Sequence, residues 1–99
     1  MGILGIIKSM FGNSTDYNAL INNGAVVVDV RTPGEFQSGH VKGSQNIPLD
    51  VLPQKVSQLK GKEVILVCRS GGRAMRAKSI LQNNGITAHN AGAWQNIKN

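Results

Sequence analysis

The chain has 99 residues, which is room for a single domain with a modest hydrophobic core. Apolar residues make up 40% of it and charged residues 16%, a mixture typical of globular rather than disordered proteins. No apolar run is long enough to span a bilayer, so we expect no transmembrane segment. One cysteine excludes an internal disulfide, and the few histidines and carboxylates argue against a metal site, so we expect no cofactor.

The charge of the chain is strongly basic. Eleven lysines and arginines against five carboxylates give a net charge of +6, which favours anionic partners. The lysines are spread along the chain without a basic block or interleaved aromatic residues, so we expect no nucleic-acid partner. Three of the four arginines instead follow the only cysteine at close spacing: Arg69, Arg73 and Arg76.

The first twelve residues are apolar with one charge, at Lys8, and lack the order of features that marks a secretory signal. One helical face collects four apolar side chains, Ile3, Ile6, Ile7 and Met10. We therefore expect a short amphipathic helix over residues 1–12 that docks on a domain formed by residues 13–99. A helix that binds a membrane surface or a partner protein is the alternative.

A helix and a buried strand are expected next. Ser14 or Thr15 can cap the helix, with Asp16 in its first turn, and Gly24 supplies the left-handed residue that ends it. The apolar stripe of this helix is Tyr17, Leu20 and Ile21. The β-branched run over residues 25–30 then predicts a strand buried on both faces, as in a parallel sheet.

The rest of the chain alternates between strand and helix signals. The expected elements are a turn over 31–34, a short strand over 44–48, a helix with Leu52, Val56 and Leu59 on one face, a strand over 64–67, a helix over 73–84 and a last strand over 86–89. This alternation predicts a small α/β domain with a mostly parallel sheet.

The most informative segment is Cys68-Arg69-Ser70-Gly71-Gly72-Arg73-Ala74, which joins a predicted buried strand to a predicted helix. Ligand sites of open α/β sheets lie at this edge. The two glycines let backbone N–H groups turn toward the sulfur, and the helix N-terminus and the arginines add positive charge. These groups favour the thiolate of Cys68, so we expect a nucleophile that receives an anionic substrate. The alternative is a small apolar cysteine that ends a buried strand.

Three charged residues are expected to support this loop. Asp29 and Arg31 end the first buried strand and so reach the same edge of the sheet. We expect Asp29 to hold the arginine-rich loop, and Arg31 to pair with Glu35, four residues further on. Direct contact of these residues with substrate is the alternative.

The cysteine loop strongly resembles the active loop of single-domain rhodanese sulfurtransferases. Three further segments resemble that family in the same order along the chain. They are Val28-Asp29-Val30-Arg31 with Glu35-Phe36, the run Gly39-His40-Val41-Lys42-Gly43-Ser44-Gln45-Asn46-Ile47-Pro48, and, imperfectly, Asn90-Ala91-Gly92-Ala93-Trp94. The resemblance covers about residues 15 to 95.

The resemblance implies a central parallel sheet with helices on both faces, and a sulfurtransferase activity. Cys68 would take a sulfane sulfur from a small anionic donor such as thiosulfate, and a thiol, cyanide or a sulfur-relay protein would remove it. The expected substrate-binding residues are Arg69, Ser70, Gly71, Gly72 and Arg73, whose N–H groups and charges suit a persulfide and a sulfite-like leaving group.

Other functions stay open. The same fold serves a non-enzymatic persulfide carrier or a partner-binding module that loads Cys68 from another protein. A phosphatase or arsenate reductase is disfavoured, because the loop between Cys68 and Arg73 is one residue shorter than the phosphatase loop. Thioredoxin-type chemistry is disfavoured because the chain has no C-x-x-C pair. The cysteine must remain reduced, so we expect a cytoplasmic setting.

Overall fold

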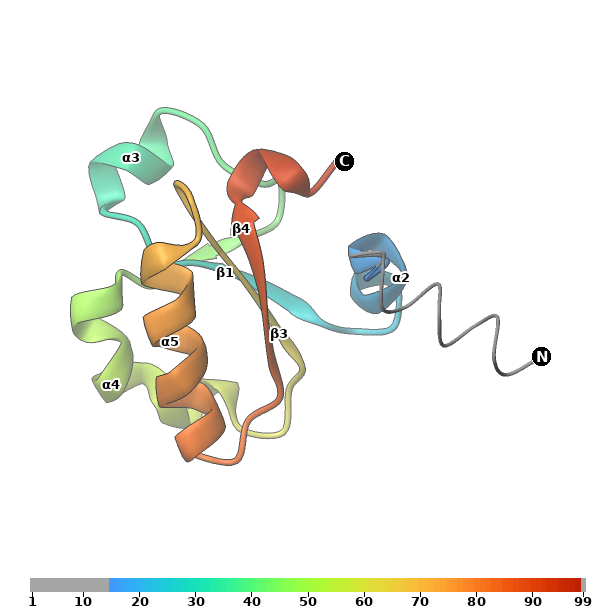
Figure 1. Ribbon diagram of the computed structural model, residues 1–99, viewed down its shortest axis with the longest axis vertical. Coiled ribbons are helices and arrows are strands. Elements are labelled where there is room, and N and C mark those ends of the chain that lie inside the picture. Colours follow the sequence, from blue (N-terminus) through green and yellow to red (C-terminus); the bar gives the residue numbers. More distant parts are fainter. Residues whose placement is uncertain (1–14, 99) are drawn as a thin grey trace.

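A four-stranded parallel sheet organises the computed structural model, which describes residues 15–98 (Figure 1). The strands are β1 (Val26–Asp29), β2 (Gln45–Asn46), β3 (Val64–Cys68) and β4 (Ala88–Ala93), in the spatial order β2-β1-β3-β4. All three pairings are parallel. The carboxyl ends of β1 and β3 therefore lie side by side, with Asp29 opposite Val67. The predicted mostly parallel α/β sheet is confirmed.

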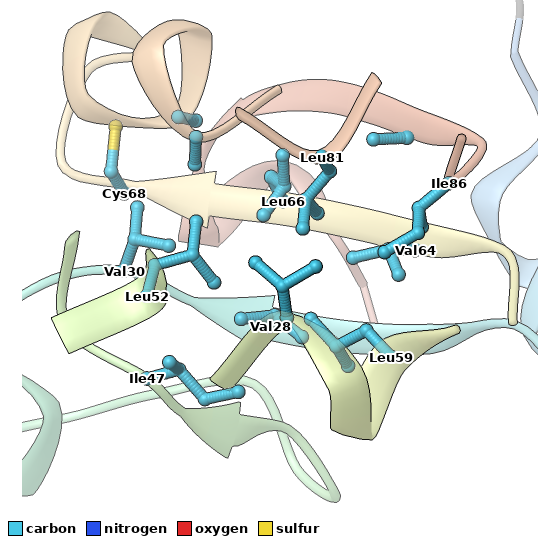
Figure 2. Close-up of a cluster of buried hydrophobic side chains, with 14 residues drawn as sticks. Val28, Val30, Ile47, Leu52, Leu59, Val64, Leu66, Cys68, Leu81 and Ile86 are labelled. Carbon is cyan, nitrogen blue, oxygen red and sulfur yellow. The ribbon is translucent and has the colours of Figure 1, made fainter. Parts of the chain in front are cut away.

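Helices cover both faces of the sheet, as the resemblance implied. On one side lie α4 (Leu52–Lys55) and the long helix α5 (Gly72–Asn83), and on the other lies α2 (Tyr17–Asn22) (Figure 1). The larger core cluster, shared by the sheet with α4 and α5, includes Val28, Leu52, Leu66, Ala77 and Leu81 (Figure 2). The second cluster lies on the α2 side and includes Val27, Ile65 and Val67, with Tyr17, Leu20 and Ile21 packed against it.

The first helix begins one residue later than the sequence predicts. Asp16 is its N-cap, because the Asp16 carboxylate accepts a hydrogen bond of 3.0 Å from the backbone N–H of Ala19. Ser14 was one of the two expected caps and lies outside the described residues, as does the helix expected over 1–12. Gly24 ends the element with a φ of +103°, as expected.

A short helix, α3 (Pro33–Gln37), replaces the second half of the turn expected over residues 31–34. Thr32 and Glu35 form a reciprocal capping box, in which each side chain accepts a hydrogen bond from the other residue's backbone N–H. Pro33 occupies the first helical position, where its missing N–H costs nothing. The Thr-Pro-x-Glu pattern carries this signal in the sequence.

Two further boundaries differ from the prediction. The helix expected from Leu52 to Leu59 is divided into α4 and a 3-10 turn over 56–59, and a further 3-10 turn over 49–51 precedes it. Pro53 is the second residue of α4 and lacks the N–H that a continuous helix from residue 49 would need. The last strand begins at Ala88 because the N–H of Ile86 closes the end of α5 on the carbonyl of Leu81, at 3.0 Å.

No helix within residues 15–98 is long and apolar enough to cross a membrane.

Candidate active site

Cys68 ends β3, and its sulfur points away from the buried aliphatic side chains toward the loop that leads into α5 (Figure 2). The residue is 1% exposed. The backbone N–H of Gly71 donates a hydrogen bond of 2.8 Å to Sγ. The sequence suggested that amides over residues 69–73 surround the sulfur. Within residues 15–98, the amide that donates to the sulfur is that of Gly71. Cys68 is therefore a buried member of the larger core cluster whose sulfur also accepts a hydrogen bond from a backbone amide.

The Gly71 amide reaches the sulfur because the loop turns sharply. Gly71 has φ of +106° and ψ of −15°, a conformation that residues with a Cβ rarely adopt. The helix α5 begins at the next residue, Gly72. A cysteine, a tight turn and a helix start therefore follow one another over a few residues at the carboxyl edge of the sheet.

Asn90 fixes the loop from the neighbouring strand. Its side-chain N–H donates to the carbonyl of Gly71 at 3.0 Å, and its side-chain oxygen accepts from the N–H of Gly92 at 2.9 Å. Asn90 belongs to β4, which pairs with β3. Asn90 has no predicted role in the site, although it directly follows the strand predicted over 86–89.

Arg73 is held by Glu35 rather than left open above the loop. Its two terminal nitrogens donate to the two carboxylate oxygens of Glu35, at 2.7 and 3.0 Å. The expected pairing of Arg31 with Glu35 is therefore wrong. The bonds from Arg73 are the main cause that lowers the pKa of Glu35 from 4.5 to about 2, and the Thr32 backbone N–H adds to the effect. The same bonds raise the pKa of Arg73.

Asp29 and Arg31 form a buried ion pair with each other. The Arg31 guanidinium donates to both carboxylate oxygens of Asp29, with a shortest distance of 2.7 Å, and the Arg31 backbone N–H adds a bond of 3.0 Å. The guanidinium also donates to the carbonyl of Gly39 at 2.6 Å and lies 5.2 Å from the ring centroid of Trp94. Asp29 therefore holds Arg31, and the expectation that it holds the arginine-rich loop is wrong.

Arg69 and Ser70 lie exposed in the loop itself. Arg69 takes part in no ion pair among residues 15–98, unlike Arg73 and Arg31. The loop therefore presents the charge of Arg69 to solvent, whereas a carboxylate neutralises the charge of Arg73. Arg69 is accordingly the loop arginine whose charge is available to an anion.

The histidines are engaged elsewhere. His40 is exposed, stacks on the ring of Phe36 at 3.7 Å, and bonds the Phe36 carbonyl through Nδ1 at 2.7 Å. His89 lies in β4 and contacts the carboxylate of Glu63 at 2.6 Å. Residues 15–98 contain no group of three or more histidine, cysteine or acidic side chains that could hold a metal ion.

Residues 13–99 match the family model described as the rhodanese-like domain. The chain belongs to the rhodanese-like family. The solved structure of a rhodanese with anions from E. coli superimposes with a TM-score of 0.69 at 31% identity, covering 75% of this chain and 92% of that one. The fold thus has a counterpart in this rhodanese.

Two curated relatives differ in whether their names state a function. The thiosulfate sulfurtransferase PspE of Escherichia coli is 35% identical over 74 residues, covering 71% of each chain. The uncharacterized protein YqhL of Bacillus subtilis is 42% identical over 64 residues, covering 64% of this chain. The aligned part spans about half the length of YqhL, 51%. Rhodanese-like relatives of this chain therefore include a protein named for sulfur transfer.

Proposed function

We propose that this protein is a sulfurtransferase that carries a sulfane sulfur on Cys68. The observation that carries the proposal is the sulfur of Cys68 at the end of β3, accepting a hydrogen bond of 2.8 Å from the Gly71 amide. A hydrogen bond from an N–H group stabilises negative charge on sulfur, both in the thiolate and in a persulfide. The sulfurtransferase name of PspE supports the same reaction class.

The reaction proceeds in two balanced steps. The Cys68 thiolate attacks the outer sulfur of thiosulfate, a sulfur–sulfur bond forms on Cys68, and sulfite leaves with the electron pair of the bond that breaks. The acceptor, cyanide or a thiolate, then attacks the outer sulfur of the Cys68 persulfide. Thiocyanate or a new persulfide leaves, and Cys68 returns as a thiolate. No metal or external oxidant takes part in either step.

The exposed side of the loop suits an anionic donor. Arg69, the residue after Cys68, presents a positive charge to solvent, and α5 starts at Gly72, three residues further on. Ser70, Gly71 and Gly72 complete the short connection between Cys68 and Arg73. This connection is one residue shorter than the phosphatase loop, so we expect it to accommodate one sulfur atom in preference to a tetrahedral phosphate.

Thiosulfate-dependent formation of thiocyanate from cyanide tests the activity, together with intact-protein mass spectrometry after exposure to thiosulfate. We expect turnover and a gain of one sulfur atom in mass. The C68S variant should lose both, because oxygen cannot form a persulfide, and should keep the fold. Transfer that survives in C68S would remove Cys68 from the mechanism. A mass gain without turnover would favour a persulfide carrier, and faster hydrolysis of an aryl phosphate would favour a phosphatase.

We also propose a domain formed by residues 13–99 that works in a reducing, cytoplasmic setting. The family match over these residues supports the boundary. The chemistry supports the setting, because a sulfur carrier needs its cysteine unpaired between cycles, and Cys68 is the single cysteine of the chain. Fractionation of cells followed by detection of the protein tests the location, and recovery from an oxidising compartment would contradict it.

A further inference from the structure

A cavity of about 370 Å³ lies between the segment that follows β1 and β2 and the first turns of α5. It is lined by Val30, Thr32, Pro48, Leu49, Asp50, Arg73 and Arg76. Its volume falls within the range of small-molecule sites, about 300 to 1,000 Å³. Val30 is buried, and Pro48 and Leu49 are half-buried, so the floor is apolar and the rim is polar.

Cys68 does not line this cavity, but its neighbour Val30 does. Val30 follows β1 and donates its backbone N–H to the carbonyl of Val67 at 3.1 Å, which places it beside the end of β3. Figure 2 shows the side chain of Val30 beside that of Cys68. Arg73 both closes the cysteine loop and lines the cavity. A molecule in the cavity can therefore extend toward the loop that holds the sulfur.

The charges around the cavity differ in how they are paired. Both terminal nitrogens of Arg73 are bound to Glu35. Arg76 and Asp50 are exposed, and neither takes part in an ion pair among residues 15–98. The rim therefore offers one cation and one anion that do not neutralise each other. The chemical complement is a small molecule that carries a carboxylate and an ammonium group together.

We propose that this cavity is the acceptor subsite, and that it binds the zwitterionic amino-acid group of a small thiol. Arg76 binds the carboxylate, Asp50 binds the ammonium group, and the apolar floor contacts the carbon chain. The proposal rests on the proposed sulfurtransferase function. In the transfer, the acceptor thiolate attacks the outer sulfur of the Cys68 persulfide, which leaves the acceptor as a persulfide and Cys68 as a thiolate.

A larger cavity on the α2 side of the sheet is not suited to this role. It measures about 540 Å³ and is lined by α2 and β1, including Ile21, Ala25 and Val27 on the α2 side of the sheet. Cys68 belongs to the core cluster on the opposite side. The charged residues of that cavity are Lys42 and Lys98, so it offers no anion for an ammonium group.

Three acceptor thiols that differ by one charged group test whether the cavity recognises both a carboxylate and an ammonium group. Cysteine carries both charges, cysteamine lacks the carboxylate, and 3-mercaptopropionate lacks the ammonium group. The kcat/KM of each acceptor is measured with thiosulfate as the donor, and ratios between acceptors are compared among variants. The intrinsic reactivity of each thiol is the same for every variant, and persulfide formation is the same for every acceptor. Both therefore cancel when the ratios of kcat/KM are compared among variants.

The R76Q and D50N variants should change different ratios. R76Q should lower the preference for cysteine over cysteamine by about threefold, the order expected for an exposed charge pair. D50N should lower the preference for cysteine over 3-mercaptopropionate by a similar factor. K78Q removes a positive charge from the same helix outside the cavity lining and should leave both ratios unchanged. If R76Q and K78Q behave alike, the subsite proposal is overturned.

A binding experiment separates this proposal from the proposed function. S-methylcysteine carries the amino-acid group but no thiol, so its binding requires no sulfur transfer. We expect it to shift backbone amide resonances of Val30 and Leu49 in the wild-type protein and to lose affinity in R76Q. Turnover without any such shift would overturn the subsite and spare the proposed enzyme. Binding without persulfide formation would overturn the proposed enzyme, and with it the acceptor role, while leaving an amino-acid site in the cavity.

Discussion

Arg73 directs both of its terminal nitrogens at the carboxylate of Glu35, although the two residues are 38 positions apart in the chain. The contact ties the first turn of α5 to α3, which Figure 1 shows next to the loop that joins β3 to α5. Glu35 is itself fixed, because it closes the capping box with Thr32. The loop is therefore held at its far end by a short helix from a distant part of the sequence.

Because of this contact, we expect different roles for the two loop arginines, Arg69 and Arg73. Arg73 is neutralised and positioned, so R73Q should reduce sulfur transfer from thiosulfate and from a neutral organic trisulfide to a similar extent. Arg69 has no ion-pair partner among residues 15–98, so R69Q should weaken thiosulfate selectively, by about threefold to fivefold in kcat/KM. Steady-state kinetics with both donors measures the two effects. A selective loss with thiosulfate in R73Q would show that Arg73 binds the anion after all.

The Glu35 carboxylate makes a pH-dependent contribution to stability. Its pKa in the folded protein is about 2, against 4.5 without its partners, so the folded state favours the ionised form. The contribution is complete above about pH 4.5 and is lost as the pH falls toward 2. Urea unfolding of the wild type and E35Q should show a difference at neutral pH that disappears over this range.

The E35Q substitution keeps an oxygen that can accept from the Thr32 N–H, so the start of α3 is preserved. The comparison therefore isolates the charge. The same difference should shrink in high salt, because both side chains are about one-third exposed, at 33% and 29%. A difference that persists unchanged down to pH 2 would mean that the Arg73 contact does not depend on the ionised carboxylate.

Local sequence patterns predicted the elements that position the sulfur. β1 and β3 are rich in valine and isoleucine, and all their residues except Val26 are buried, so their burial and pairing follow from composition. The step from Cys68 through two glycines to α5 is also local, and α5 starts at Gly72, one residue before the predicted start at Arg73. The turn expected over 31–34 is wrong in its second half, because the Thr32 capping box favours a helix start more strongly than Gly34 favours a turn.

The ionic contacts could not be predicted in the same way. A spacing of four residues suggested Arg31 with Glu35, but that rule holds within one helix, and α3 begins only at Pro33. Arg31 therefore lies outside the helix and turns back to Asp29 in the preceding strand. The contact of Glu35 with Arg73, and the cavity that brings Asp50 near Arg76, depend on how distant elements pack.

The ion pair of Asp29 and Arg31 should dominate the stability of this edge of the sheet. Their side chains are 0% and 5% exposed, so D29N leaves a buried guanidinium without its counter-charge. We expect a loss of about 3 kcal/mol in the free energy of unfolding. Urea denaturation at neutral pH measures it. D50N makes the same chemical change at an exposed position and should cost less than about 0.5 kcal/mol. Equal costs for the two variants would contradict the buried-pair assignment.

The turn at Gly71 offers a way to separate the stability of the loop from its function. Gly71 has φ of +106° and Gly61 has φ of +78°, so alanine strains the backbone at both positions. A Cβ at Gly61 would meet no atom within 4 Å, and one at Gly71 would meet ordinary contacts of 3.6 Å or more. We therefore expect G71A and G61A to lower the free energy of unfolding by a similar amount, about 1 kcal/mol.

Their effects on sulfur transfer should differ widely. G71A displaces the amide that donates to Cys68 Sγ, whereas G61A lies in the connection before β3, at the opposite end of the strand. G71A should lower kcat/KM for thiosulfate at least about tenfold, because a donor aimed at developing charge contributes strongly to rate. G61A should stay near the wild-type value. Equal activities in the two variants, at equal stability, would mean that the Gly71 amide does not assist the chemistry at Cys68.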